Sequence, residues 1–436
     1  MARNSMIVWG TIAVMLTAAQ CVSSVPALSD SQPAGTAADQ VRLMNECERK
    51  AFDYFIDQTD PWTGLTRDRA SNFGPNTHDI ASSAASGFAL AALAVGVERG
   101  WISRDAAAAR ATTTLTFFRN RAQQEHGWFY HFMDVHTGKR AWTSEISSID
   151  TALLLAGALL AGHTLGGTAV PSLADEIYRR VDFPWMLTDN GDKPNSRLLC
   201  HGWKPESGFI PYRWDSYSEL MILYLLAMGS PTHPIPASCW DAWRRPEGEY
   251  AGFRTFKMGP LFTFEFSQAF VDFRGRQDRG RYDYWSAAVN AVKADRQFCI
   301  DHSNQFHTYG PDVWGLSACD GPDGYRAYGA PPGSAFCDGT AAPLAVVASI
   351  ALTPDLALAS MQHVKTTLDG KIWGRYGFSD AFNIDRNWFD QDVIGIDLGC
   401  ALLMLENERS AFVWKQFMGI PEIQVALDLA GLRKSN

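Results

Sequence analysis

Acidic, basic and aromatic side chains gather just ahead of an apolar stretch in this 436-residue sequence. The segment SGFIPYRWD at residues 207–215 is followed directly by SYSEL, so Arg213, Trp214, Asp215 and Glu219 lie close together in the chain. One carboxyl group can protonate a leaving oxygen while another activates water, and glycoside hydrolysis needs both tasks. Aromatic rings stack on sugar rings, and arginine forms paired hydrogen bonds. These residue types therefore indicate chemistry on a carbohydrate.

Further acids precede two other apolar stretches. Glu145 begins the segment EISSIDTALLLAGAL, and Asp150 lies about one helical turn further along. Asp215 and Glu219 are four residues apart, which predicts that they share one face of a helix start. The candidate catalytic residues are Glu145, Glu219 and Asp150, and the further acids are Glu206, Asp215, Asp380, Asp390 and Asp392.

The same acids also fit a purely structural role as helix caps. SYSE at residues 216–219 and SSID at residues 147–150 both match the S/T-x-x-E/D capping pattern, and acidic side chains favour helix N-termini. Capping alone could explain any single acid. The gathering of several acids with Trp, Tyr or Arg at the same end of similar helices favours chemistry.

Aromatic and charged side chains beside these acids are the candidates for substrate binding. For Arg67 and Asp68 a solvated turn is an equal alternative, and for Tyr309 and Trp314 an ordered aromatic loop is an equal alternative. The full set is Arg67, Asp68, Trp142, Trp203, Glu206, Tyr212, Arg213, Trp214, Asp215, Tyr217, Tyr309, Trp314, Trp388 and Asp392.

A pattern of a Gly-aromatic segment followed by an apolar helix recurs along the chain. The Gly-aromatic segments are HGWFYHFMD (126–134), SGFIPYRWD (207–215) and YGFSDAFN (376–383). The expected apolar helices begin at Trp142, Trp214 and Trp388, and two more, without the full preceding segment, begin at His78 and Cys337.

Amphipathic segments alternate with the apolar ones, at residues 41–58, 104–124, 172–181, 282–299 and 355–368. Helices that are apolar on all sides are enclosed, whereas helices with a charged face form a layer in contact with water. We therefore predict an all-α fold, an (α/α)6 toroid or barrel of alternating inner and outer helices. Residues 253–273 would form ordered loops or hairpins, or supply the sixth inner helix near residues 263–273. If the inner helices share a direction, their N-terminal ends line one mouth.

Composition and missing motifs exclude several other functions. The net charge is −9 with no basic run, which argues against a nucleic-acid partner. The GxGxxG, P-loop and nucleophile-elbow patterns are absent, which argues against nucleotide chemistry and serine hydrolysis. The sequence has no CxxC or HExxH, so no structural zinc is expected. Cys319 and Cys337 flank a Gly/Pro-rich loop, which predicts a disulfide between them.

The N-terminus is typical of an export signal. Arg3 supplies a positive charge, residues 6–19 form an apolar run too short to span a bilayer, and residues 25–27 offer a cleavage site. We predict a signal peptide at residues 1–27, a linker at 28–40, a catalytic domain at 41–436, and a periplasmic or secreted location. A lipid anchor at Cys21 is the less favoured alternative, because Gln20 fits that signal poorly. No later segment predicts a membrane span.

Four stretches resemble the glucoamylase-like domain of the bacterial β-1,2-glucanases, glycoside hydrolase family 144. They are residues 48–71, 145–159, 208–234 and 376–418, and the resemblance extends from Glu46 to Met418. It implies an (α/α)6 barrel, hydrolysis of linear β-1,2-glucan to sophorose and short sophoro-oligosaccharides, inversion at the anomeric carbon, and neither metal nor cofactor. By position it implies catalytic roles for Glu145 and Glu219, with Asp150 as a third candidate and Asp215 in support.

Three alternatives remain open from the sequence. Related domains in cyclic β-1,2-glucan synthases act as retaining transglycosylases, and the fold does not determine the outcome. The chain could also be a glycan-binding protein without activity, or a polysaccharide lyase that uses Tyr and His on an acidic sugar.

Overall fold

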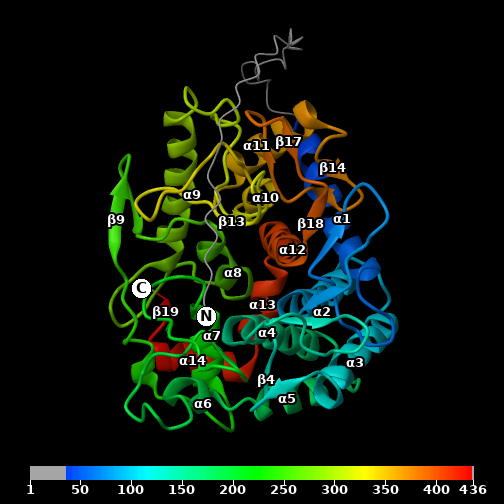
Figure 1. The fold of residues 1–436 in the computed structure, drawn as a ribbon, viewed down its shortest axis with the longest axis vertical. Helices are drawn as coiled ribbons and strands as arrows, with labels where there is room; N and C mark the ends of the chain where they lie inside the picture. Colours follow the sequence, from blue (N-terminus) through cyan, green and yellow to red (C-terminus); the bar gives the residue numbers. More distant parts are fainter. Residues whose placement is uncertain (1–35, 435–436) are drawn as a thin grey trace, which may run out of the picture. The chain divides into compact units, whose positions relative to one another are not determined.

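The computed structural model describes residues 36–434, so the expected signal peptide and most of the expected linker lie outside the described residues. In the described part, six helices pack side by side in a closed ring in which the last contacts the first (Figure 1). These inner helices are α2 (Ser83–Glu98), α4 (Ser148–Thr164), α7 (Met221–Gly229), α8 (Phe262–Phe270), α10 (Pro343–Ala348) and α12 (Gly395–Ser410). A sixth inner helix near residues 263–273 was one of the predicted alternatives, and helix α8 lies there.

A second layer of helices covers the ring. The outer helix α1 packs on α2 and α12, α3 on α2, α5 on α4, α14 on α7, α9 on α8, and α11 on α10. The outer helices are α1 (Ala37–Asp57), α3 (Arg104–Asn120), α5 (Val170–Arg180), α9 (Tyr284–Asp301), α11 (Pro354–Leu368) and α14 (Pro421–Ala430). The predicted (α/α)6 barrel is therefore confirmed. Two short helices, α6 (Phe183–Thr188) and α13 (Phe412–Met418), and the 3-10 turn η1 (Ala237–Cys239) complete the helical elements of the described range.

Short antiparallel strands connect the helices, and the sequence indicated a hairpin only at residues 253–273, where β10 pairs with β9. The Gly-aromatic segments form parts of hairpins, and β2, β6 and β18 run directly into the inner helices α2, α4 and α12. The strands are β1 (Arg69–Ser71), β2 (Ile80–Ser82), β3 (Gln124–Glu125), β4 (Trp128–Phe129), β5 (Phe132–Asp134), β6 (Ile146–Ser147), β7 (Gly202–Lys204), β8 (Gly208–Phe209), β9 (Glu247–Tyr250), β10 (Phe253–Phe256), β11 (Arg276–Gln277), β12 (Ala318–Cys319), β13 (Arg326–Ala327), β14 (Trp373–Gly374), β15 (Gly377–Phe378), β16 (Phe382–Asn383), β17 (Trp388–Phe389), β18 (Asp392–Ile394) and β19 (Arg433–Lys434).

The entrance to α7 differs from the expected helix start at Trp214. The helix begins at Met221, and its N-cap, Leu220, makes no side-chain cap bond, so the expected SYSE capping box does not form. Backbone hydrogen bonds to Arg244 hold the preceding segment out of the helix: Arg244 N donates to Asp215 O, and Tyr217 N donates to Arg244 O. Asp215 and Glu219 therefore do not share a helix face. The SSID motif does cap α4, because Ser147 Oγ accepts from the backbone N–H of Asp150.

Helices α2 and α4 cross at two glycines with almost no space between their backbones. A methyl group on Gly157 would lie 1.8 Å from the carbonyl oxygen of Gly87. Gly157→Ala is therefore expected to lower the free energy of unfolding by about 1–3 kcal/mol through overpacking, measured by urea denaturation. Gly166→Ala is the matched control, because nothing lies within 4 Å of its added methyl group. Equal stability of the two variants would contradict this close crossing.

The described cysteines contradict the predicted disulfide. All seven cysteines from Cys47 to Cys400 are free, so the predicted Cys319–Cys337 disulfide is wrong. Cys319 is buried on β12, whereas Cys337 is partly exposed in the loop beyond β13. Within residues 36–434, none of the helices combines the length and the apolarity needed to cross a membrane.

Candidate active site

Two cavities meet at Glu219 and Phe262, at the N-terminal end of the inner helices. We call the first, of about 370 Å³, the acidic cavity; Asp68, Arg69, His131, Asp150, Glu219 and Tyr325 are among its lining residues. We call the second, of about 770 Å³, the aromatic cavity; His201, Tyr212, Trp214, Asp215, Glu219 and Phe262 are among its lining residues. The first turns of α4 and α12 and the segment before β1 line the acidic cavity. The loop before α7 lines both cavities, which adjoin at Glu219.

Glu219 lies on the boundary between the two cavities, two residues before α7 begins. Burial raises the pKa of its carboxyl group to about 7, and the negative charge of Asp150 adds to this rise. Hydrogen bonds to Ser218 and to its own backbone only partly oppose the shift. A carboxyl group that still carries a proton near neutral pH can act as a general acid.

A histidine lies between the other two candidate catalytic carboxylates. His131 Nδ1 is 3.0 Å from Glu145 Oε1, and His131 Nε2 is 3.5 Å from Asp150 Oδ1. Burial alone would raise the pKa of Glu145, but the hydrogen bond and charge of His131 outweigh burial and lower it. Asp150 lines the acidic cavity, whereas Glu145 is not among the lining residues and reaches the site through His131. Glu219 and Asp150 are thus the predicted catalytic residues that share one cavity.

A cluster of acids stands beside Arg69 at the acidic cavity. One carboxylate oxygen from each of Asp320, Asp380 and Asp390 lies within 4.8 Å of the other two, a spacing that could hold a metal ion. Arg69 Nη1 is 2.6 Å from Asp320 Oδ2. Burial, followed by the neighbouring negative charges, raises the pKa of Asp390 to about 7 and of Asp397 to about 8. The cluster can therefore keep protons at a pH where exposed carboxyl groups have lost them.

Asp390→Asn is expected to stabilise the protein at pH 8 and to have much less effect at pH 4. Because the pKa of Asp390 is raised in the folded state, the folded chain binds more protons than the unfolded chain between about pH 4 and 7, and its stability falls as the pH rises through this window. Asparagine keeps the acceptor for the backbone N–H of Asp392. Melting temperatures at the two pH values test this, with Asp175→Asn as the control at an exposed pair with Arg179. Equal shifts at both pH values would contradict it.

Several predicted binding residues do line the cavities. Asp68 faces the acidic cavity, and Tyr212, Arg213, Trp214 and Asp215 face the aromatic cavity. Tyr212 is 68% exposed, with its ring 6.3 Å from that of His201, while the ring of Trp214 stacks on His201 at 3.9 Å. Asp215 pairs with Arg244 at 2.8 Å. Arg213 borders the same cavity, but its guanidinium is bound to the carbonyl oxygens of Leu187 and Leu198 and to Asp189, which argues against a role in binding sugar hydroxyl groups.

Three predicted aromatic residues lie in the core instead of the site. Tyr217, Tyr309 and Trp314 are only 1–4% exposed, so they offer no face on which a sugar could stack. Tyr217 packs on Phe256, and the hydroxyl group of Tyr309 donates to the carbonyl oxygen of Thr340. This burial argues against the predicted stacking of these three rings on a sugar.

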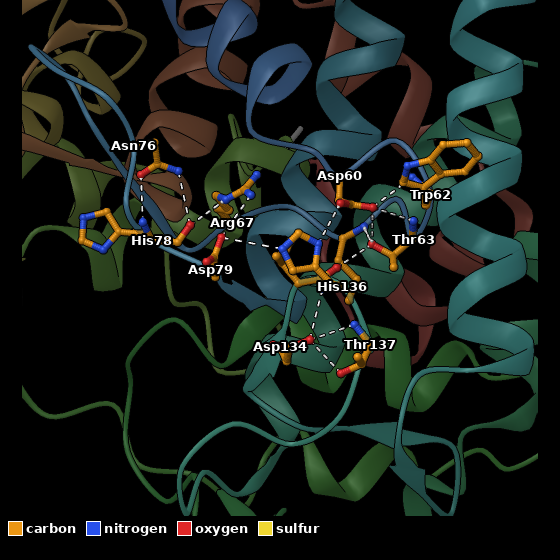
Figure 2. A network of polar contacts seen from close by, with 12 residues as sticks. Asp60, Trp62, Thr63, Arg67, Asn76, His78, Asp79, Asp134, His136 and Thr137 are labelled. Carbon is orange, nitrogen blue, oxygen red and sulfur yellow. Dashed lines mark hydrogen bonds and ion pairs between the residues drawn. The ribbon is translucent and has the colours of Figure 1, made fainter.

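The remaining predicted binding residues lie outside the lining of the two cavities. Arg67 donates to the carbonyl oxygen of His78 and pairs with Asp79, so it holds the loop around residues 76–79 (Figure 2). Asp392 Oδ2 is 2.9 Å from His78 Nε2. Trp142 is 69% exposed and touches the cavity residue Phe132 edge-on. The others make local contacts: Trp203 packs on Trp185, Glu206 pairs with Arg140, and Trp388 lies half-buried on β17.

Sequence reasoning missed His131, His201, Arg69, Asp320, Asp397 and Tyr325. His131 belongs to the HGWFYHFMD segment, but nothing in the sequence distinguishes it from a structural histidine. Its place opposite Glu145 depends on the pairing of Tyr130 with Ile146. That pairing joins segments whose register the sequence does not specify.

Comparison with known proteins places these features among carbohydrate-active enzymes. The family model described as "Putative glucoamylase" matches residues 211–421. The structure of an endo-β-1,2-glucanase from Chitinophaga pinensis, in complex with sophorotriose and glucose, is 30% identical, with a TM-score of 0.81, and covers 90% of this chain and 98% of that one. A "putative glucoamylase" structure from Bacteroides caccae is 29% identical, with a TM-score of 0.82 and coverage of 91% and 100%.

A curated relative comes from Parabacteroides distasonis and is named an exo β-1,2-glucooligosaccharide sophorohydrolase acting at the non-reducing end. It is 27% identical over 421 residues, which include 88% of this chain. The chain spans 57% of the length of that relative.

Proposed function

This chain belongs to the glucoamylase-like family of bacterial β-1,2-glucanases, glycoside hydrolase family 144, and on that premise we propose that it hydrolyses linear β-1,2-glucan to sophorose and short sophoro-oligosaccharides. The named activities of the relatives from Chitinophaga pinensis and Parabacteroides distasonis support this substrate. One observation carries the proposal: Glu219 and Asp150 line the same cavity. The pKa of Glu219 is raised to about 7, and the carboxylate of Asp150 lies beside His131.

In the proposed reaction, Glu219 is the general acid and Asp150 is the general base. Asp150 accepts a proton from a water molecule whose oxygen forms the new bond to the anomeric carbon. The glycosidic bond breaks, and Glu219 gives its proton to the leaving oxygen, so protons and charge balance. Glu145, which the family resemblance favoured as a catalytic acid, acts indirectly in this scheme because His131 separates it from the cavity. Inversion at the anomeric carbon is part of the proposal.

Reducing-sugar release from β-1,2-glucan tests the proposal. We expect new reducing ends to accumulate without any co-substrate. Binding of the glucan without new reducing ends would instead indicate a glycan-binding protein. An ultraviolet-absorbing unsaturated product from an acidic polysaccharide would indicate a lyase.

Export to the periplasm or the medium is a second proposal, which rests on the charged and apolar pattern of residues 1–27. We expect the mature chain to begin near Leu28. N-terminal sequencing of the native protein tests this, and an intact Met1 on cytosolic protein would contradict it.

A further inference from the structure

Each ring nitrogen of His131 faces a different carboxylate. Nδ1 is 3.0 Å from Glu145 Oε1, and Nε2 is 3.5 Å from Asp150 Oδ1. The backbone fixes the residue in place, because its N–H donates to the carbonyl oxygen of Glu145 and its own carbonyl oxygen accepts from Ser83 N. The ring stacks on Phe132 with centroids 3.7 Å apart.

The two contacts of His131 favour a charged ring. A neutral imidazole has one N–H and one acceptor nitrogen, and an ionised carboxylate only accepts. A neutral His131 would therefore turn a lone pair toward one of its two carboxylates. An imidazolium has an N–H on both nitrogens, so it presents a donor to Glu145 and a donor to Asp150.

The charges around His131 favour the imidazolium. Acids face it from three segments: Asp68 before β1, Glu145 before β6, and Asp150 in the first turn of α4. Lys204 on β7 acts on Glu145, and Arg69 acts on Asp68. Burial opposes the charged ring, but Asp150 and Glu145 outweigh burial and raise the pKa of His131 to about 9.

The two oxygens of Asp150 have different partners. Ser147 Oγ donates to Asp150 Oδ2 at 2.5 Å, while Oδ1 faces His131 Nε2. The carboxylate is thus held between a serine hydroxyl and the histidine while it lines the acidic cavity. Without the positive ring, Asp150 and Glu145 would be two neighbouring negative charges with a neutral group between them.

We propose that His131 is a positioning residue whose imidazolium holds Asp150 and Glu145 in their ionised forms and keeps Asp150 ready to accept a proton from water. This inference rests on the proposed function for its catalytic consequence. It also divides the roles in the site: the two carboxylates beside His131 stay ionised, and Glu219, which has no such cation, carries the proton.

The pH profile of His131→Gln tests the proposal. Glutamine can still donate one hydrogen bond but carries no charge, so the cation that lowers the pKa of Glu145 and faces Asp150 Oδ1 is lost. Loss of a neighbouring opposite charge shifts a carboxyl pKa by about one to three units, so the acidic limb of the kcat/KM profile should move upward by about that amount. We expect kcat near pH 5 to fall about tenfold or more, with less loss at higher pH and little change in KM.

His136→Gln is the matched control, because His136 Nδ1 also pairs with a buried carboxylate, Asp60, at 3.1 Å, but its side chain is 55% exposed and lines neither cavity (Figure 2). Its pH profile should match that of the wild type. A uniform loss of activity at every pH in His131→Gln, or an unchanged acidic limb, would overturn the proposal.

A second measurement does not need the variant to fold or the substrate to be cleaved. In wild-type protein labelled with ¹⁵N at histidine, both ring nitrogens of His131 should keep imidazolium shifts up to about pH 8. Titration of His131 near pH 6.5 or below would overturn the proposal. If the wild type does not cleave β-1,2-glucan while His131 remains protonated, the proposed substrate fails and the charge assignment stands.

Discussion

Replacing Glu219 by glutamine is expected to reduce turnover of β-1,2-glucan by about a hundredfold or more, as is typical for the loss of an acid–base group. Glutamine has nearly the same shape but carries no acidic proton for the leaving oxygen. The carbonyl oxygen of Glu219, which accepts from Ser267 Oγ, is not altered. Glu219 also lies outside α7 and caps nothing. The melting temperature of Glu219→Gln should therefore equal that of the wild type or exceed it slightly, since a buried carboxyl group is removed.

Glu206→Gln provides the control for the Glu219 variant. Glu206 pairs with Arg140 on an exposed hairpin turn and lines neither cavity, so its loss should leave turnover within about twofold of the wild type. Initial rates with saturating β-1,2-glucan compare the two. Near-normal turnover of Glu219→Gln would remove Glu219 from the role of proton donor.

Asp150→Asn should cause the second large loss, again about a hundredfold or more in kcat, because asparagine cannot accept the proton from water. Glu145→Gln should cause a smaller loss, since Glu145 acts on the cavity through His131. Steady-state kinetics of the two variants separate the roles. A larger loss in Glu145→Gln than in Asp150→Asn would transfer the role of base to Glu145.

Asp150 also takes part in the cap of α4, and this contribution needs its own control. Ser147→Ala removes the hydroxyl group that accepts from the backbone N–H of Asp150 and donates to Asp150 Oδ2, but it leaves the carboxylate and its contact with His131. It should cost about 1 kcal/mol of stability, as for other N-cap losses, with a much smaller change in kcat than Asp150→Asn. If Ser147→Ala reduced kcat as strongly, the effect of Asp150→Asn would be attributed to the helix end.

The inner helices could be predicted because their sequences are apolar on every side. In α2, every residue from Ser83 to Gly96 is buried, and the sequence there has no charged side chain. The beginning of α7 could not be predicted, because the backbone of Arg244, nearly thirty residues further along, holds residues 215–217 out of the helix. The C-terminal helix α14 also went unidentified, because its outer place beside α7 depends on contacts across the whole chain.

In the candidate site, too, features that depend on contacts between distant segments could not be predicted. The shared cavity of Glu219 and Asp150 could be expected, because acids at helix entrances converge wherever the helices share a direction. Tyr217 and Tyr212 are alike in type and lie in the same segment, yet one is buried and the other is exposed. Aromatic rings from other segments, among them Phe256 and Phe264, pack on Tyr217 and bury it. His131 depends on a strand register, which local sequence does not determine.

Time-resolved proton NMR of wild-type protein acting on β-1,2-glucan tests the central claim most directly. An inverting enzyme needs room for water between its two carboxyl groups, about 6.5–9.5 Å, whereas a retaining enzyme places them about 5–5.5 Å apart. With Glu219 as acid and Asp150 as base, we expect sophorose and short sophoro-oligosaccharides whose first reducing ends are the α-anomer. A β-anomer first, or longer glucans at high substrate, would contradict it and make one carboxylate a nucleophile. An unchanged glucan would contradict the proposed substrate itself.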